Sequence, residues 1–236
     1  MNISYKAFTL SIALFVVGCA QYSTHSEWHV LQDQYQDAIA DAAVIEVSEK
    51  VALESIVGES QKFVTWTAYP DSFSKGEEVA LSWGELWVTL DNHVQQRCQA
   101  FPKQALNLRI QQLLGLPPQQ SDVDRFFVVL TVDAKDVFRP CANGDLDQVQ
   151  CEASFPDSTT EAHKAWYAGQ TALAYQEKGY PWTRLGYTYD WSGYSRAEAK
   201  SGSAAELSEV GVNEFVIHRN AKVRVESILS TEEYCR

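Results

Sequence analysis

Residues Arg125 to Val132 read Arg-Phe-Phe-Val-Val-Leu-Thr-Val and form the most continuous apolar run after residue 19. Valine, phenylalanine and threonine favour extended backbone. A run that does not alternate with polar residues indicates a strand that is covered on both faces. We therefore expect a central strand of a sheet here, with the rest of the domain built around it.

The rest of the chain mixes strand and helix patterns without a steady strand–helix–strand alternation. Further strands are expected at Gln61–Tyr69, Glu85–Leu90 and Thr183–Trp191, with two more inside Val212–Ile228 joined by a turn at Arg219-Asn220. Helices are expected at Glu27–Ala43, from Asp91, from Pro102 to Gly115, and from the capping box Ser158-x-x-Glu161. Ala197–Ser208 is expected to be a loop. The predicted class is α+β, with a mixed or antiparallel sheet flanked by helices.

The first residues have the pattern of an export signal. Lys6 precedes an apolar stretch, Ala7 to Val17, that is much shorter than the roughly 20 residues a membrane-spanning helix needs. The stretch ends in Val16-Val17-Gly18-Cys19, which resembles the lipobox of bacterial lipoproteins. The resemblance implies cleavage before Cys19 and attachment of diacylglycerol to its thiol. The alternative is an ordinary cleaved signal peptide with Cys19 as a structural thiol.

This resemblance sets the expected domain organisation and location. Residues 1–18 would be the signal peptide, residues 19–26 a polar tether, and residues 27–236 a single α+β domain in the periplasm or on the surface. Acyl chains on Cys19 would make the membrane a partner. Ala20 after the cysteine is similar to the pattern that is sorted to the outer membrane in a host with two membranes.

Four further cysteines follow at Cys98, Cys141, Cys151 and Cys235. An even number in an oxidising compartment predicts two disulfides. We prefer the pairs Cys141–Cys151 and Cys98–Cys235, because Asn143-Gly144 is a turn signal between the first two. The alternatives are a metal site or a catalytic thiol, but no two cysteines have the close spacing of structural zinc sites, and we expect no metal.

Composition excludes some functions. The chain has 31 acidic residues against 19 basic ones, a formal charge of -12, so we expect no nucleic-acid partner. With 7 Trp, 11 Tyr and 10 Phe it is too aromatic for a disordered protein. The sequence contains neither a glycine-rich phosphate loop nor the His-Glu-x-x-His and Gly-x-Ser-x-Gly motifs, so no cofactor is expected.

The densest aromatic segment is Tyr180–Tyr194. If it is a strand, one face is aromatic and the other carries an arginine and an aspartate. We expect four of its residues to be candidates for a ligand groove, namely Trp182, Arg184, Tyr187 and Asp190. The alternative is a core strand in which the two charged residues pair with each other.

Two residues are candidates for catalysis. His163 lies one turn into the helix that follows the capping box, where it would need an orienting carboxylate. Asn213-Glu214-Phe-Val-Ile followed by Lys222-Val-Arg-Val resembles the terminal strand pair of ADP-ribosyltransferases, which implies Glu214 as a catalytic carboxylate. Val212 stands where that family has its first acidic or amide residue, so the motif is broken.

No catalytic motif is complete, and the sequence therefore favours a binding protein over an enzyme. The expected function is a membrane-anchored lipoprotein whose soluble domain binds an envelope component, such as a polymer, or a protein partner. The alternative is a cell-envelope hydrolase or transferase in which His163, Arg184, Asp190 and Glu214 converge on one site.

Overall fold

Strand β4 (Phe126–Asp133) lies in the interior of the sheet, as the apolar run predicts. The computed structural model describes residues 18–119, 123–192 and 209–236, with side chains from Glu27 onward. In it, β4 pairs antiparallel with β1 (Ser60–Thr67) on one side and with β8 (Lys222–Ser230) on the other. Both faces of β4 are buried, which is why its sequence does not alternate.

The described residues form one eight-stranded sheet in which every pairing is antiparallel. Its order is β2-β8-β4-β1-β3-β7-β5, and β6 also pairs with β7. The other strands are β2 (Glu78–Ala80), β3 (Leu86–Leu90), β5 (Val137–Phe138), β6 (Tyr187–Tyr189) and β7 (Val210–Ile217). The α+β class with an antiparallel sheet and flanking helices is confirmed.

The sheet is curled. Strands β7 and β8 follow each other through a turn in which Ala221 N–H donates to His218 C=O at 3.1 Å, and Asn220 adopts a left-handed φ of 65°. Three strands nevertheless lie between them, which would separate them by about 19 Å in a flat sheet. A turn spans less than about 7 Å, so the sheet must bend back on itself.

The expected turn at Arg219-Asn220 joins these two strands, but the strands do not pair with each other. The curled sheet instead encloses a first core, to which almost every strand contributes. Its fully covered members include Phe63, Leu81, Leu90, Leu130, Phe215, Ile217, Val223 and Val225.

The outer face of the sheet carries a second core beneath three short helices. These are α2 (Asp91–Cys98), α3 (Leu106–Leu113) and α6 (Thr231–Tyr234). Val94, Ile110 and Leu113 from α2 and α3 pack on Val64 and Phe127 of the sheet. The expected helix at Asp91 is confirmed, but its N-cap is Leu90 and Asp91 lies in the first turn.

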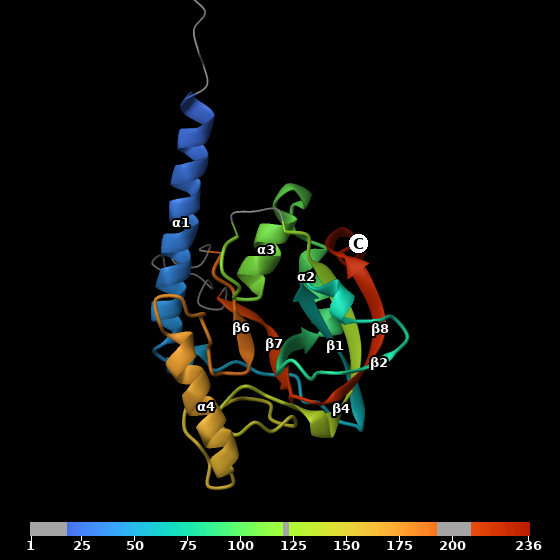
Figure 1. The fold of residues 1–236 in the computed structure, drawn as a ribbon. Helices are drawn as coiled ribbons and strands as arrows, with labels where there is room; N and C mark the ends of the chain where they lie inside the picture. The colour runs from blue at the N-terminus through green and yellow to red at the C-terminus, as the bar shows by residue number, and fades with distance from the viewer. Residues whose placement is uncertain (1–17, 120–122, 193–208) are drawn as a thin grey trace, which may run out of the picture.

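Two longer helices lie beside the sheet on one side of the molecule (Figure 1). They are α1 (Gly18–Ala42) and α4 (Glu161–Ala174). Helix α1 begins before Glu27, so residues 19–26 are helical where we expected a tether. Its apolar stripe packs on this domain, because Tyr35 and Ile39 contact Tyr189 and Trp191.

Helix α4 begins two residues later than the capping box predicts. Thr160 is its N-cap and accepts a hydrogen bond from His163 N–H. Single 3-10 turns occur at Val47–Glu49, Pro70–Ser72, Lys103–Ala105 and Ala134–Asp136.

Both preferred disulfides are confirmed. Cys98–Cys235 joins α2 to the end of the chain, and Cys141–Cys151 closes the loop after β5. Of the helices in the described ranges, none is both long and apolar enough to cross a membrane. Residues 1–17 of the expected signal peptide and the expected loop at Ala197–Ser208 lie outside the described residues.

Candidate functional site

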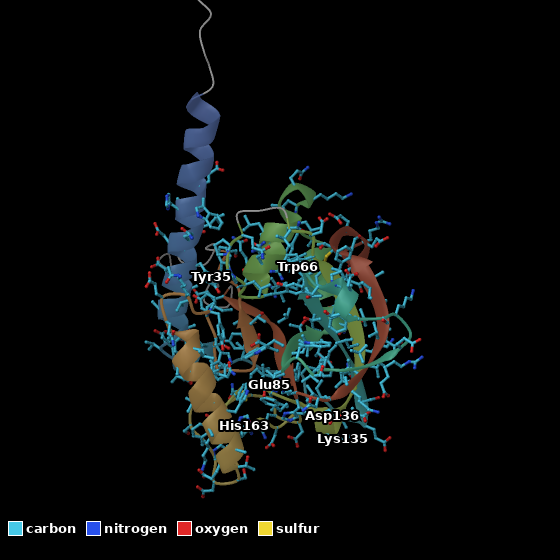
Figure 2. All side chains as sticks on the ribbon, viewed as in Figure 1. Tyr35, Trp66, Glu85, Lys135, Asp136 and His163 are labelled. Carbon is cyan, nitrogen blue, oxygen red and sulfur yellow. A yellow bond between two sulfur atoms is a disulfide. The ribbon has the colours of Figure 1, made fainter. Side chains whose placement is uncertain are left out.

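A cavity of about 490 Å³ lies between the outer face of the sheet and the elements that cover it. Strands β1, β3, β4, β6 and β7 form its floor, and α1, the end of α3 and the segment after α4 form its walls. Figure 2 shows Tyr35 on α1 and Trp66 on β1, two of the residues that line it from different sides. Its size is typical of sites that hold small organic molecules.

The wall of the cavity is mostly aromatic and aliphatic. Five of its lining residues carry six-membered rings, namely Tyr35, Trp66, Trp87, Phe127 and Tyr180. Several polar groups on the wall already bond to the protein. The Tyr180 hydroxyl donates to Gln170 Oε1 at 2.8 Å, and the Thr188 hydroxyl donates to Leu113 C=O at 2.6 Å.

Glu214 is the one acidic residue among the described residues that line this cavity. It shares a face of β7 with Val212, which lies in the core under α3, and it alternates with Phe215, which points into the enclosed core. Its backbone pairs in register with Thr89 of β3, and its N–H donates to Gly186 C=O at 3.0 Å. Strand geometry therefore directs the carboxyl group into the cavity.

No described residue hydrogen-bonds or ion-pairs with the Glu214 carboxyl group. Burial against apolar walls disfavours the charged form and raises the pKa of Glu214 to about 8. The side chain is enclosed by protein yet keeps some exposure, because it borders the open cavity. At neutral pH the group is largely a neutral acid, which can donate one hydrogen bond and accept others.

The residues expected to form a ligand groove lie in the protein interior instead. Trp182 is 2% exposed, and its indole N–H donates to Pro140 C=O at 3.2 Å. Tyr187 is also buried, and its hydroxyl donates a hydrogen bond to Glu49 C=O at 2.8 Å. These two side chains support the fold.

The two charged residues of the same segment have separate partners, so the pair between them that belonged to the alternative interpretation does not form. Asp190 is 2% exposed and is held by the Arg109 guanidinium through two contacts of 3.2 and 3.1 Å. Arg184 donates to Ala42 and Ala43 C=O at the end of α1. The segment is a strand only over Tyr187–Tyr189, because Arg184 and Gly186 adopt left-handed φ values that break the alternation.

The two catalytic candidates border different hollows. Glu214 lines the large cavity, whereas His163 lines a surface hollow of about 440 Å³ beside the loop after β5. His163 Nε2 lies 2.7 Å from Cys141 C=O. Arg184 and Asp190 are held elsewhere, so the structure does not bring the four candidate residues into one site.

One group was missed from the sequence. Carboxylate oxygens of Asp41, Glu49 and Glu209 lie within 4.8 Å of one another, a spacing that suits a metal ion. Tyr189 O–H also donates to Asp41 Oδ2 at 2.8 Å. The three acids come from α1, the 3-10 turn after it and the residue before β7, so no sequence spacing could have revealed the cluster. The cavity was missed for the same reason, since its walls come from nearly every part of the chain.

Comparisons with protein-family models, with curated proteins and with solved structures give no match to this chain.

Proposed function

We propose that this chain is a membrane-anchored lipoprotein whose domain binds a small, largely apolar envelope component in the Glu214 cavity. The observation that carries the proposal is the aromatic-walled cavity with a single carboxyl group to which no described residue bonds. Such a combination gives affinity through apolar contact and orientation through one polar group.

The chemistry of the walls defines the ligand. Its body should be apolar or aromatic, because rings of Trp66, Trp87 and Phe127 face it. Its polar group should be neutral and should accept a hydrogen bond, because the Glu214 carboxyl group is protonated at neutral pH. A carbonyl, an amide or a hydroxyl meets this requirement.

The proposed location rests on the leader. Val16-Val17-Gly18-Cys19 would place the acyl chains at the start of α1, directly before the domain. A ligand drawn from the envelope would then be available at short range. The outer membrane is the proposed membrane in a host that has two.

A cavity-filling substitution tests the binding site. Thr89 is nearly buried on β3, opposite Glu214, so a phenylalanine at position 89 would occupy the space. We expect Thr89→Phe to abolish binding of N-phenyl-1-naphthylamine, a neutral apolar fluorophore, as measured by its emission. The matched control is Thr131→Phe, which places the same side chain on β4 outside the cavity. Equal binding by both variants would contradict the proposal.

A second function has one specific observation in its favour. A carboxyl group with a pKa of about 8 can act as a general acid near neutral pH, so an envelope hydrolase or transferase is the alternative. Glu214→Gln separates the two functions. The amide keeps the shape and hydrogen bonding, so a binding protein retains its ligand, whereas an enzyme retains the ligand and loses turnover.

A further inference from the structure

The surface hollow around His163 differs chemically from the Glu214 cavity. It is open, has a volume of about 440 Å³ and lies between the start of β3, the loop after β5 and the first turns of α4. Figure 2 labels two of its residues, Glu85 and His163, at the end of the molecule away from the start of α1.

The base of the hollow is a group of packed rings. Phe138 is buried there, its ring 4.7 Å from Trp166 in an edge-to-face contact and 4.7 Å from His218 in a stacked one. Trp166 is partly exposed, and its indole N–H donates to Glu85 Oε2 at 2.8 Å. The rings therefore form a fixed apolar surface with polar atoms at its edge.

Cross-links and close packing hold this arrangement in place. His163 is fixed to Cys141 C=O, and Cys141 is joined to Cys151 by the disulfide. Gly144 allows the imidazole to approach, because a Cβ there would lie 2.8 Å from His163 Cε1 and the backbone has a φ of 76°. A binding surface formed in advance loses little conformational entropy when a ligand arrives.

The rim supplies groups that both donate and accept. Asp145, Ser158 and His218 are exposed there, and the His218 ring nitrogens make no hydrogen bond with a described residue. Glu85 uses one carboxylate oxygen for the indole, which leaves the other for a ligand. Hydroxyl groups are the natural partners of such a set, because each can donate and accept.

The charges of the lining residues restrict which ligands the hollow can bind. Of the described residues that line the hollow, two are acidic and none is lysine or arginine. A phosphate or nucleotide would meet carboxylates without a compensating cation. We infer that the hollow binds a neutral saccharide, whose ring C–H face packs on Trp166 and His218 and whose hydroxyl groups bond to Glu85 and Asp145.

The position of the hollow suits a polymer ligand. The hollow lies at the end opposite the start of α1 (Figures 1 and 2), so acyl chains on Cys19 would leave it facing away from the membrane. This orientation rests on the proposed lipid anchor, whereas the site itself does not.

The test uses the full chain in detergent with three neutral probes, chitotetraose, cellotetraose and maltotetraose. Binding is detected by saturation-transfer NMR and quantified by calorimetry. At least one probe should bind, and inorganic phosphate should not compete. Asp145→Ala and His218→Ala should each weaken that binding about tenfold, the usual effect of losing one good polar or ring contact.

Two controls make the result specific. Asp157→Ala removes another exposed aspartate, next in sequence to Ser158 but outside the lining of the hollow, and should leave saccharide affinity unchanged. Glu214→Gln should also leave it unchanged, so failure of the apolar-ligand proposal would not be mistaken for failure of this one. The inference is overturned if no probe binds, if phosphate displaces the sugar, or if the two hollow variants bind as well as the wild type.

Discussion

At the scale of single residues, the carboxyl group of Glu214 links stability to pH. Its pKa rises from 4.5 to about 8 on folding, so between these values the folded state holds a proton that the unfolded state has released. Stability should therefore fall as the pH rises from 4.5 to about 8 and then level off. The largest loss of unfolding free energy that this shift allows is about 5 kcal/mol. We expect a loss of about 2 to 4 kcal/mol because the cavity admits water.

Glu214→Gln removes the titrating group and should therefore remove the loss of stability between about pH 4.5 and about pH 8. Urea unfolding of wild type and variant at about pH 5 and about pH 9 measures it. At the lower pH the two should have similar stability, and at the higher pH the variant should be more stable. Parallel pH profiles would show that Glu214 is solvated in the folded protein.

Asp190 has a structural role, with Arg109 rather than Arg184 as its partner. It is buried against Arg109, and removal of one member of such a pair leaves the other without its counter-charge. Asp190→Asn should lower the free energy of unfolding by about 2 to 4 kcal/mol without changing fluorophore binding. Asp133→Asn, which breaks an exposed pair with Lys135, is the control and should have little effect.

At the scale of elements, the disulfides should differ in their effect on stability. Cys98–Cys235 closes a loop with a sequence separation of 137, and Cys141–Cys151 one with a separation of 10. Chain entropy gives about 5 kcal/mol for the first and about 3 kcal/mol for the second. Paired alanine substitutions and thermal unfolding test this order.

The Cys141→Ala/Cys151→Ala variant should also lose saccharide affinity while it keeps fluorophore binding. Loss of both kinds of binding would contradict the proposal that the two sites are separate.

Elements with strong local patterns could be predicted from the sequence. The continuous apolar run is β4, and the four-residue spacing of Tyr35 and Ile39 marks the buried stripe of α1. Both disulfide pairs follow from cysteine parity and a turn signal. Each of these signals is a property of neighbouring residues or of composition.

What could not be predicted depends on contacts between distant segments. The turn at Arg219-Asn220 fits a hairpin equally well, and only the curl of the whole sheet separates β7 from β8. The expected strand at Thr183–Trp191 is interrupted before β6 because Arg184 has left-handed backbone. Arginine is not a residue type that indicates this conformation, so the sequence does not reveal the interruption. Glu214 is a candidate only through the resemblance to ADP-ribosyltransferases, and its cavity depends on α1, the end of α3 and β6 together.

At the scale of the whole molecule, the proposed sites and the proposed anchor lie in different places. Helix α1 extends beyond the domain at one end (Figure 1), and His163, which lines the second hollow, lies toward the other end (Figure 2). Cys19→Ser should abolish incorporation of labelled palmitate and release the protein from the membrane fraction, because a single thiol would carry the first acyl group. The α1 control Asp33→Ala should remain labelled. Membrane retention of an unlabelled Cys19→Ser protein would contradict the lipid anchor.

The most direct test of the Glu214 cavity is the pH dependence of its affinity for N-phenyl-1-naphthylamine, measured for wild type and Glu214→Gln between about pH 6 and about pH 10. Because the neutral acid is the binding form, wild-type affinity should hold up to about pH 8 and then fall, approaching about tenfold per pH unit. The glutamine variant should bind across the whole range with no such fall. An affinity that is independent of pH in both proteins, or that falls equally in both, would contradict a ligand site built around a neutral Glu214.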